Sequence, residues 1–162
     1  EFTNLPRKFN ICVSGSRDDF AHTHINDLGF VPIAHPETGE MGFNVIVGGL
    51  FSIKRNDMSI SMDTWVRPDQ VVDLSRAVLR VFRDNGERKV RQQCRLMYLL
   101  DNLGVDKFRE LVGESMGLKL PLLRGVPEKY DEEFPRRDLL GVHPQKQEGL
   151  SWVGFAIPAG RL

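Results

Sequence analysis

The chain has 162 residues and a mass of 18.5 kDa, with 22 basic and 22 acidic side chains. That length predicts a domain that buries a sizeable core, and a net charge of zero removes whole-molecule attraction to nucleic acid or to an anionic membrane. Two cysteines exclude a disulfide-rich scaffold and cannot alone form a four-thiolate metal site, and no apolar run approaches the ~20 residues of a membrane span.

The first half of the sequence predicts strands. Residues 7–13 alternate apolar and polar side chains, which is typical of a half-buried strand. Residues 18–28 predict a short helix, 30–34 a second strand, and 42–47 a nearly continuous apolar strand that we expect to be central. Residues 59–65 alternate again and predict an edge strand.

The second half predicts helices over residues 69–85, 90–103 and 106–116, the last with Asp106 as its N-cap. Residues 118–139 lack periodicity but are too apolar for a linker, so we expect a loop or docking segment. Strands followed by helices predict an α+β fold, a mixed β-sheet of about five strands with helices packed on it.

Lys8 and Asn10 form the first candidate site. On a strand they share one face and lie ~7 Å apart. A cation beside an amide donor suits a small oxyanion. The competing interpretation is a strand end whose polar side chains are simply exposed to water. The spacing of Lys8 and Asn10 alone favours this second interpretation.

Three arginines form the second candidate site. Arg88, Arg91 and Arg95 follow i, i+3, i+7 spacing, which on a helix makes a row of ~10 Å able to clamp carboxylates or phosphates. Charge runs usually form solvated helix faces instead. Glu87 is the only acid among residues 85–100, which is less typical of such a face.

Other motifs point to no chemistry. The histidines lack acid or cysteine partners at ligand spacing, so no metal site is expected. Gly48 and Gly49 lack a phosphate-loop motif and predict a close approach of backbone to a bulky group. Cys94 is interpreted as a core thiol.

Several ordered motifs together resemble the ferredoxin-dependent nitrite and sulfite reductases. They are NLPRKFN at residues 4–10, HIND at 24–27, GFNVIVGG at 42–49, FRDNG at 82–86 with RQQCR at 91–95, and GVHPQKQEG at 141–149. The similarity runs from residue 4 to residue 160. It implies that residues 1–150 are the first siroheme-binding domain and that residues 151–162 begin the following ferredoxin-like half-domain. The ends of the chain agree with a domain excised from a longer protein.

The resemblance implies reduction of nitrite to ammonia with electrons from ferredoxin, which pass through a [4Fe–4S] cluster to siroheme. Carried over by position, Lys8 and Asn10 match the anion-binding pair above the siroheme. Arg7 matches a partner of the siroheme carboxylates, Arg95 matches a basic residue with the same task, and Arg91 assists it.

The family's cluster ligands are four cysteines in two close pairs, and this chain lacks that pattern. We therefore expect the cluster ligands outside this chain and no turnover by the chain alone. The expected partners are nitrite, ferredoxin and the remaining domains of the same polypeptide, with no nucleic acid and no membrane span. The expected location is the cytoplasm, or the plastid stroma in a plant.

Asn10 favours nitrite over sulfite. In sulfite reductases the matching position is a second lysine, which suits a dianion, whereas one cation with one neutral donor suits the nitrite monoanion. The alternatives are a ferredoxin-dependent sulfite reductase domain or a non-catalytic binding module on the same fold. Nucleic-acid binding through the arginine row is disfavoured by the net charge and by the scarcity of aromatic residues near the row.

Overall fold

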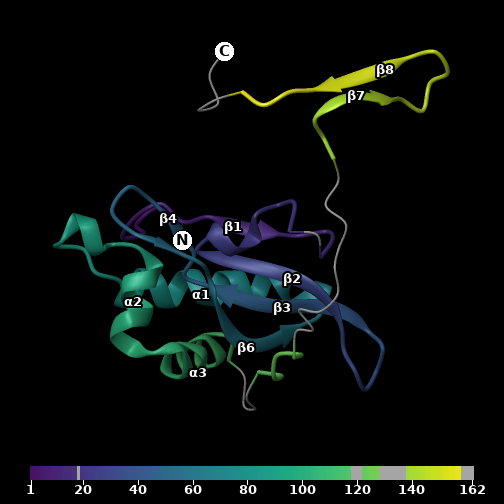
Figure 1. Cartoon of the computed structure of the whole chain (residues 1–162). Helices are drawn as coiled ribbons and strands as arrows, with labels where there is room; N and C mark the ends of the chain where they lie inside the picture. Colours follow the sequence, from purple (N-terminus) through teal and green to yellow (C-terminus); the bar gives the residue numbers. More distant parts are fainter. Residues whose placement is uncertain (18, 118–121, 128–137, 158–162) are drawn as a thin grey trace. The chain divides into compact units, whose positions relative to one another are not determined.

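A computed structural model describes residues 1–17, 19–117, 122–127 and 138–157 (Figure 1). The chain divides into two compact units, Glu1–Glu132 and Glu133–Leu162. No helix among the described residues is both long and apolar enough to cross a membrane.

The first unit is built on a four-stranded mixed sheet in the order β1-β2-β3-β6. Its strands are β1 (Ile11–Val13), β2 (Leu28–Ala34), β3 (Met41–Val47) and β6 (Ile60–Val66). β1 runs parallel to β2, and the other pairs are antiparallel. A separate two-stranded ribbon joins β4 (Leu50–Phe51) to β5 (Asn56–Asp57). The central place of β3 and the edge place of β6 are as predicted.

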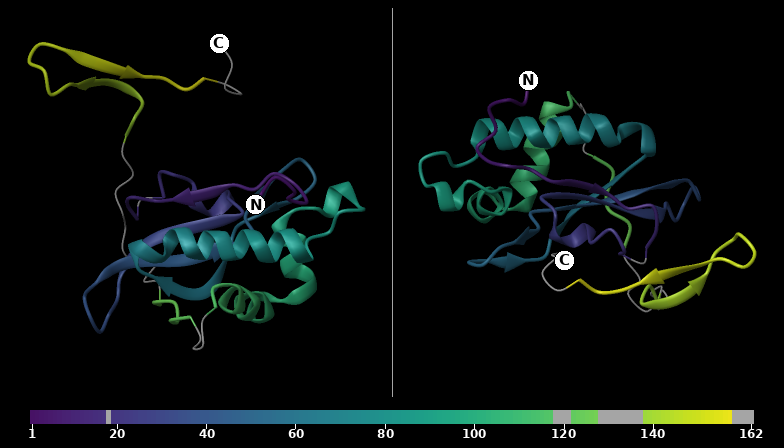
Figure 2. Two further views of the ribbon diagram at one scale, coloured as in Figure 1. Left: turned by 180° about the vertical axis from the view of Figure 1, so that it is seen from behind. Right: turned by 90° about the horizontal axis from the view of Figure 1, so that it is seen from above.

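Three helices cover one face of this sheet (Figure 2). They are α1 (Val71–Asn85), α2 (Leu96–Leu103) and α3 (Val105–Ser115). The core lies between the two layers, with Phe30 from the sheet, Phe82 from α1 and Phe108 from α3 fully buried. The expected α+β architecture is confirmed, with four strands in the main sheet.

The second unit contains a β-hairpin of β7 (Gly141–Pro144) and β8 (Ser151–Gly154). His143 and Trp152 face each other across it, with ring centroids 4.2 Å apart in a stacked arrangement. The expected division at residue 150 falls between these paired strands, and the domain boundary stays a prediction.

The predicted helix over residues 18–28 is wrong. The chain forms a single 3₁₀ turn, Thr23–Ile25, and enters β2 at Leu28. Asp19 and His22 have left-handed backbone angles, with φ of 50° and 49°, which a right-handed helix excludes. Phe20 and Leu28 do not share a buried helical face, because Phe20 is 56% exposed whereas Leu28 is a core residue of the sheet.

The predicted helix over residues 90–103 is wrong in its first half. Arg91–Gln93 form a 3₁₀ turn, Arg95 is extended with φ −95° and ψ 158°, and α2 begins at Leu96. Asp106 is not the N-cap of α3, because Gly104 holds that position. Asp106 instead accepts a hydrogen bond from Arg109 in the first turn, at 2.7 Å.

Residues 122–127 dock against the sheet, as expected for part of the 118–139 segment. The Trp65 amide donates to the Leu123 carbonyl at 2.9 Å. Asn44 pairs with the Val126 backbone through both ends of its amide, at 2.7 and 2.9 Å. Residues 118–121 and 128–137 of that prediction lie outside the described residues.

The paired glycines provide close approach, as predicted, although the neighbours belong to the chain itself. A Cβ on Gly49 would lie 2.5 Å from the carbonyl oxygens of His24 and Asn26. Gly48 has a φ of +85° and lies against the Leu100 side chain. Only glycine lets the end of β3 pass this closely over the 3₁₀ turn.

We predict that Gly49→Ala destabilises the chain by about 1–3 kcal/mol, because backbone atoms must move to admit the methyl group. Gly113→Ala is the matched control. A Cβ at Gly113, inside α3, meets nothing within 4 Å, and alanine there should stabilise the helix by about 0.5–1 kcal/mol. Urea unfolding of the two variants measures both changes, and shifts of the same sign would contradict the prediction.

Candidate functional site

The segment that carries Lys8 and Asn10 is irregular, because β1 begins only at Ile11. The strand predicted over residues 7–13 is therefore wrong for its first four positions. Contacts with distant parts of the chain hold the segment instead. Arg88 donates to the Asn4 side chain at 3.1 Å and to the Asn4 carbonyl at 2.8 Å. Arg7 donates through Nη1 to the Arg91 carbonyl at 2.5 Å.

Phe9 anchors the middle of this segment to the core. Its ring lies 5.4 Å from that of Phe82, centroid to centroid. Lys8 on one side of it in sequence is exposed, and Asn10 on the other side is half-buried. Within the described part of the chain, neither the Lys8 ammonium nor the Asn10 side-chain amide has a hydrogen-bond or ion-pair partner. Both groups are thus free to meet an anion.

Behind Asn10 lies a buried ion pair between Asp27 and Arg95, whose side chains are 1% and 9% exposed. Arg95 donates through Nε to Oδ1 of Asp27 at 3.0 Å and through Nη2 to Oδ2 at 2.8 Å. This is the bidentate arrangement that a guanidinium forms best with a carboxylate. The Asn10 backbone N–H donates to the same Oδ2 at 2.9 Å.

The predicted row of arginines on one helical face does not exist, because the chain turns at residues 91–95. Arg88 is engaged with the N-terminal segment, Arg91 offers its carbonyl to Arg7 and exposes its side chain, and Arg95 is buried. The structure nonetheless brings Arg7 and Arg91 together. Among the described residues, no acceptor engages Nη1 of Arg95.

The turn before Arg91 is organised by Glu87. Its carboxylate accepts the backbone N–H groups of Lys89, Val90 and Arg88. These hydrogen bonds, led by that from Lys89, hold the pKa of the Glu87 carboxyl below its ordinary value of 4.5. The acid that stood out among basic residues in the sequence therefore shapes the loop rather than neutralising an arginine.

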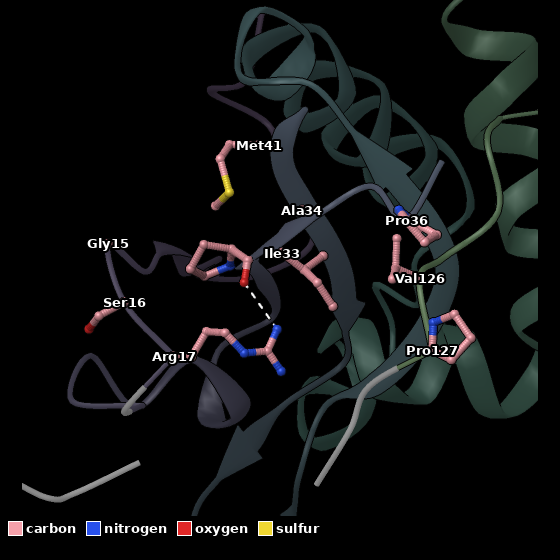
Figure 3. A pocket seen from close by; sticks show the side chains of 10 residues that line it. Gly15, Ser16, Arg17, Ile33, Ala34, Pro36, Met41, Val126 and Pro127 are labelled. Carbon is pink, nitrogen blue, oxygen red and sulfur yellow. Dashed lines mark hydrogen bonds between the residues drawn. The ribbon is translucent and has the colours of Figure 1, made fainter. Parts of the chain in front are cut away.

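A second surface feature is an apolar hollow of about 710 Å³ (Figure 3). Figure 3 shows Met41, Ile33 and Pro127 around it, with Arg17 donating to the Pro32 carbonyl at 3.2 Å. A smaller, more polar hollow of about 290 Å³ is lined by residues such as His24, Ser59 and Asp63. Nothing in the sequence periodicity pointed to either hollow.

The thiols are held within the fold. Cys94 is buried, as predicted, and donates to the Val90 carbonyl at 3.2 Å. Cys12 is half-buried, with its sulfur 3.6 Å from the Ala21 carbonyl oxygen. Across the described ranges, no group of three or more histidine, cysteine, aspartate and glutamate side chains is arranged to hold a metal ion.

Residues 1–120 match the family described as the nitrite and sulphite reductase 4Fe-4S domain. The chain therefore belongs to this family. Its fold resembles the solved structure of the NirA protein of Mycobacterium tuberculosis with a TM-score of 0.71 and 37% identity, which covers 92% of this chain and 26% of that one.

The chain is 53% identical to the ferredoxin–nitrite reductase of Synechococcus elongatus and 49% identical to the chloroplastic enzyme of Spinacia oleracea. These matches cover 100% and 99% of this chain. Sulfite reductase [ferredoxin] 2 of Mycolicibacterium paratuberculosis is 38% identical over 100% of the chain. The chain spans about a third or less of each relative, 31%, 27% and 28% of their lengths.

Sequence reasoning missed Asp27. Asp27 is the last residue of the HIND motif at residues 24–27, but its position in the sequence predicted no role for it. Its partner Arg95 lies 68 positions away, and no local periodicity connects the two. The available signal was an acid immediately before a buried strand, because a carboxylate placed there requires a cation to accompany it.

The lowered pKa of Glu87 predicts an acid-dependent loss of stability. A carboxyl whose pKa is lower in the folded than in the unfolded chain contributes stability above its unfolded pKa of about 4.5, and loses that contribution as the pH falls through the folded value. Glu87→Gln should therefore be less stable than the parent at neutral pH, with a difference that shrinks in acid. Unfolding curves of both proteins across this range measure it. A difference that stays constant, or a ¹³C-detected Glu87 titration at the ordinary pKa, would contradict it.

Proposed function

We propose that this chain is the first siroheme-binding domain of a ferredoxin-dependent nitrite reductase, which reduces nitrite to ammonia with electrons from ferredoxin. The Lys8–Asn10 pair carries the proposal: a cation and an amide donor, neither with a partner among the residues described, precede and follow in sequence an aromatic side chain packed on the core. The similarity supports nitrite, because identity to the two nitrite reductases is 53% and 49%, against 38% to the sulfite reductase.

In this proposal Lys8 binds the substrate anion by charge and Asn10 binds it by donating a hydrogen bond. As the N–O bonds break, the oxygen atoms gain negative charge and take up protons. A fixed ammonium group stabilises that developing charge, and a preorganised donor of this kind contributes ~3–4 kcal/mol. Asn10 is a neutral donor, and its contribution is nearer ~1 kcal/mol. Phe9, packed against Phe82, anchors the segment between the two residues.

The basic residues fit siroheme, a tetrapyrrole with eight carboxylates. Arg7 and Arg91 lie together, and Nη1 of Arg95 has no acceptor among the described residues, so all three would donate to those carboxylates. When bound, siroheme would supply an iron centre for anion binding and electron transfer. The chain's own groups orient the anion and balance its charge.

The residues present do not fit the [4Fe–4S] cluster. The chain has two cysteines, and the thiol of Cys94 is buried against the Val90 carbonyl. We infer that the cluster ligands lie in the remaining domains of a longer polypeptide, that residues 1–150 form this domain, and that residues 151–162 begin the next half-domain. A chain without the cluster is not active alone. The location inferred is the cytoplasm, or the plastid stroma in a plant.

The proposal is tested in the full-length protein that contains this chain. The purified protein should show siroheme absorption and oxidise reduced ferredoxin in a nitrite-dependent reaction. Lys8→Ala should lower kcat/KM for nitrite by about two to three orders of magnitude, the loss expected of a preorganised charged donor, and Asn10→Ala by about fivefold. Lys54→Ala, an exposed lysine between β4 and β5, is the matched control. A protein without siroheme, or equal effects of Lys8→Ala and Lys54→Ala, would overturn the proposal.

Sulfite is the second candidate substrate, and Asn10 decides between the two anions. We predict that Asn10→Lys shifts preference toward sulfite by adding a second cation, which suits a dianion better than a monoanion. The measurement is the ratio of kcat/KM for nitrite to that for sulfite in siroheme-replete enzyme. A ratio equal to that of the parent would show that Asn10 does not discriminate between these substrates.

A further inference from the structure

We propose that Asp27 is a positioning residue: its carboxylate, oriented by Arg95, fixes the backbone of Asn10 and so sets the direction in which the Asn10 amide meets the substrate anion. This inference rests on the proposed role of the Lys8–Asn10 pair. It assigns the carboxylate a task in anion binding although Asp27 itself touches no substrate.

The first step is that the carboxylate cannot turn. Nε and Nη2 of Arg95 each donate to a different oxygen of Asp27, at 3.0 and 2.8 Å, so the two planar groups lock each other in one plane. Both side chains are almost fully buried, at 1% and 9% exposure. A buried carboxylate without its cation is strongly disfavoured, so Arg95 keeps Asp27 charged and in place.

The second step is that residue 10 is held at both of its peptide groups. Its N–H donates to Oδ2 of Asp27 at 2.9 Å, and its carbonyl accepts from the Leu28 N–H at 3.1 Å. The Asp27 carbonyl in turn accepts from the Gly48 N–H at 2.8 Å. Asp27 therefore connects three places: its side chain binds the segment before β1 and the residue before α2, and its carbonyl binds the residue that follows β3. With both peptide groups fixed, the Cα–Cβ direction of Asn10 is fixed as well.

The third step separates Asn10 from Lys8. Lys8 is exposed, and within the part of the chain that the structure describes no hydrogen bond or ion pair connects it to Asp27; its position depends on the Phe9 anchor against Phe82. Loss of the Asp27 carboxylate should therefore impair the contribution of Asn10 while leaving that of Lys8 intact. A carboxylate that served only to hold α2 against the sheet would affect both residues alike.

The experiment is a pair of double-mutant cycles in the full-length protein, with Asp27→Asn introduced into three backgrounds: wild type, Asn10→Ala and Lys8→Ala. In the wild-type background we expect KM for nitrite to rise by up to about fivefold, because Asp27 acts through Asn10 and cannot contribute more than the Asn10 amide itself. In the Asn10→Ala background the same change should alter KM by less than about twofold, because the group that it orients is gone. In the Lys8→Ala background the rise seen in the wild type should persist in full.

A second readout needs no substrate. Amide hydrogen exchange over residues 8–13, followed by mass spectrometry of the full-length protein, reports the Asn10 N–H directly. Asp27→Asn should speed exchange at one amide of this segment by about tenfold, because a neutral acceptor holds the N–H more weakly. If the wild-type protein does not reduce nitrite, the proposed function fails, and the exchange measurement alone then decides whether Asp27 fixes Asn10.

Equal rises in KM in the wild-type and Asn10→Ala backgrounds, or exchange unchanged by Asp27→Asn, would overturn the inference and leave the ion pair a purely structural role. Should Asp27→Asn fail to fold, Asp27→Glu replaces it in the same cycles. That variant keeps the charge opposite Arg95 but displaces the oxygens by one methylene group. It should give the same dependence on Asn10, and KM and exchange at wild-type values would again overturn the inference.

Discussion

The buried pair of Asp27 and Arg95 is the interaction on which the candidate site depends. Removing one partner of such a pair costs about 3–5 kcal/mol, because the remaining charge stays buried without compensation. The pair also explains the local path of the chain. Arg95 must reach a carboxylate at the start of β2, and the 3₁₀ turn at Arg91–Gln93 with an extended residue 95 brings it there before α2 begins. A continuous helix over residues 90–103 would not place Arg95 in this contact with Asp27.

The N-terminal segment shows how an irregular stretch can be as well defined as a strand. The segment from Asn4 to Asn10 is not part of the β-sheet. It is fixed to four different places in the fold by contacts at Asn4, Arg7, Phe9 and Asn10. A strand would satisfy its backbone groups with neighbouring strands. Here side chains, among them the Asp27 carboxylate, supply many of the partners, and the polar side-chain groups of Lys8 and Asn10 have no internal partner among the described residues.

Much of the sheet and two of the helices could be predicted from the sequence, because β3 is a nearly continuous apolar run and α1 and α3 have strong apolar periodicity with clear ends. Residues 18–28 and 90–95 could not, and the physical reasons differ. The first stretch happens to space apolar residues as a helix does, whereas Asp19 and His22 adopt left-handed angles. The second stretch is shaped by the contact of Arg95 with Asp27, which lies 68 residues earlier in the chain, and a local sequence pattern carries no information about so distant a partner. The Lys8–Asn10 pair was predicted from strand alternation, the segment is not a strand, and the role of the pair stays a prediction.

The net charge of zero hides an uneven distribution. Several arginines form ion pairs, such as Arg55 with Asp101 and Arg109 with Asp106. The hydrogen bonds that Arg55 donates to Asp101 and Asp57 raise the pKa of its guanidinium. In contrast, Arg7, Lys8 and Arg91 have no acidic partner within the described ranges. Because the total is zero, an excess of acidic side chains elsewhere on the chain offsets this local excess of positive charge beside the N-terminal segment. At separations below the Debye length of about 8 Å it is this local excess, rather than the total, that an anion experiences. A chain with balanced charges can therefore still present an anion site.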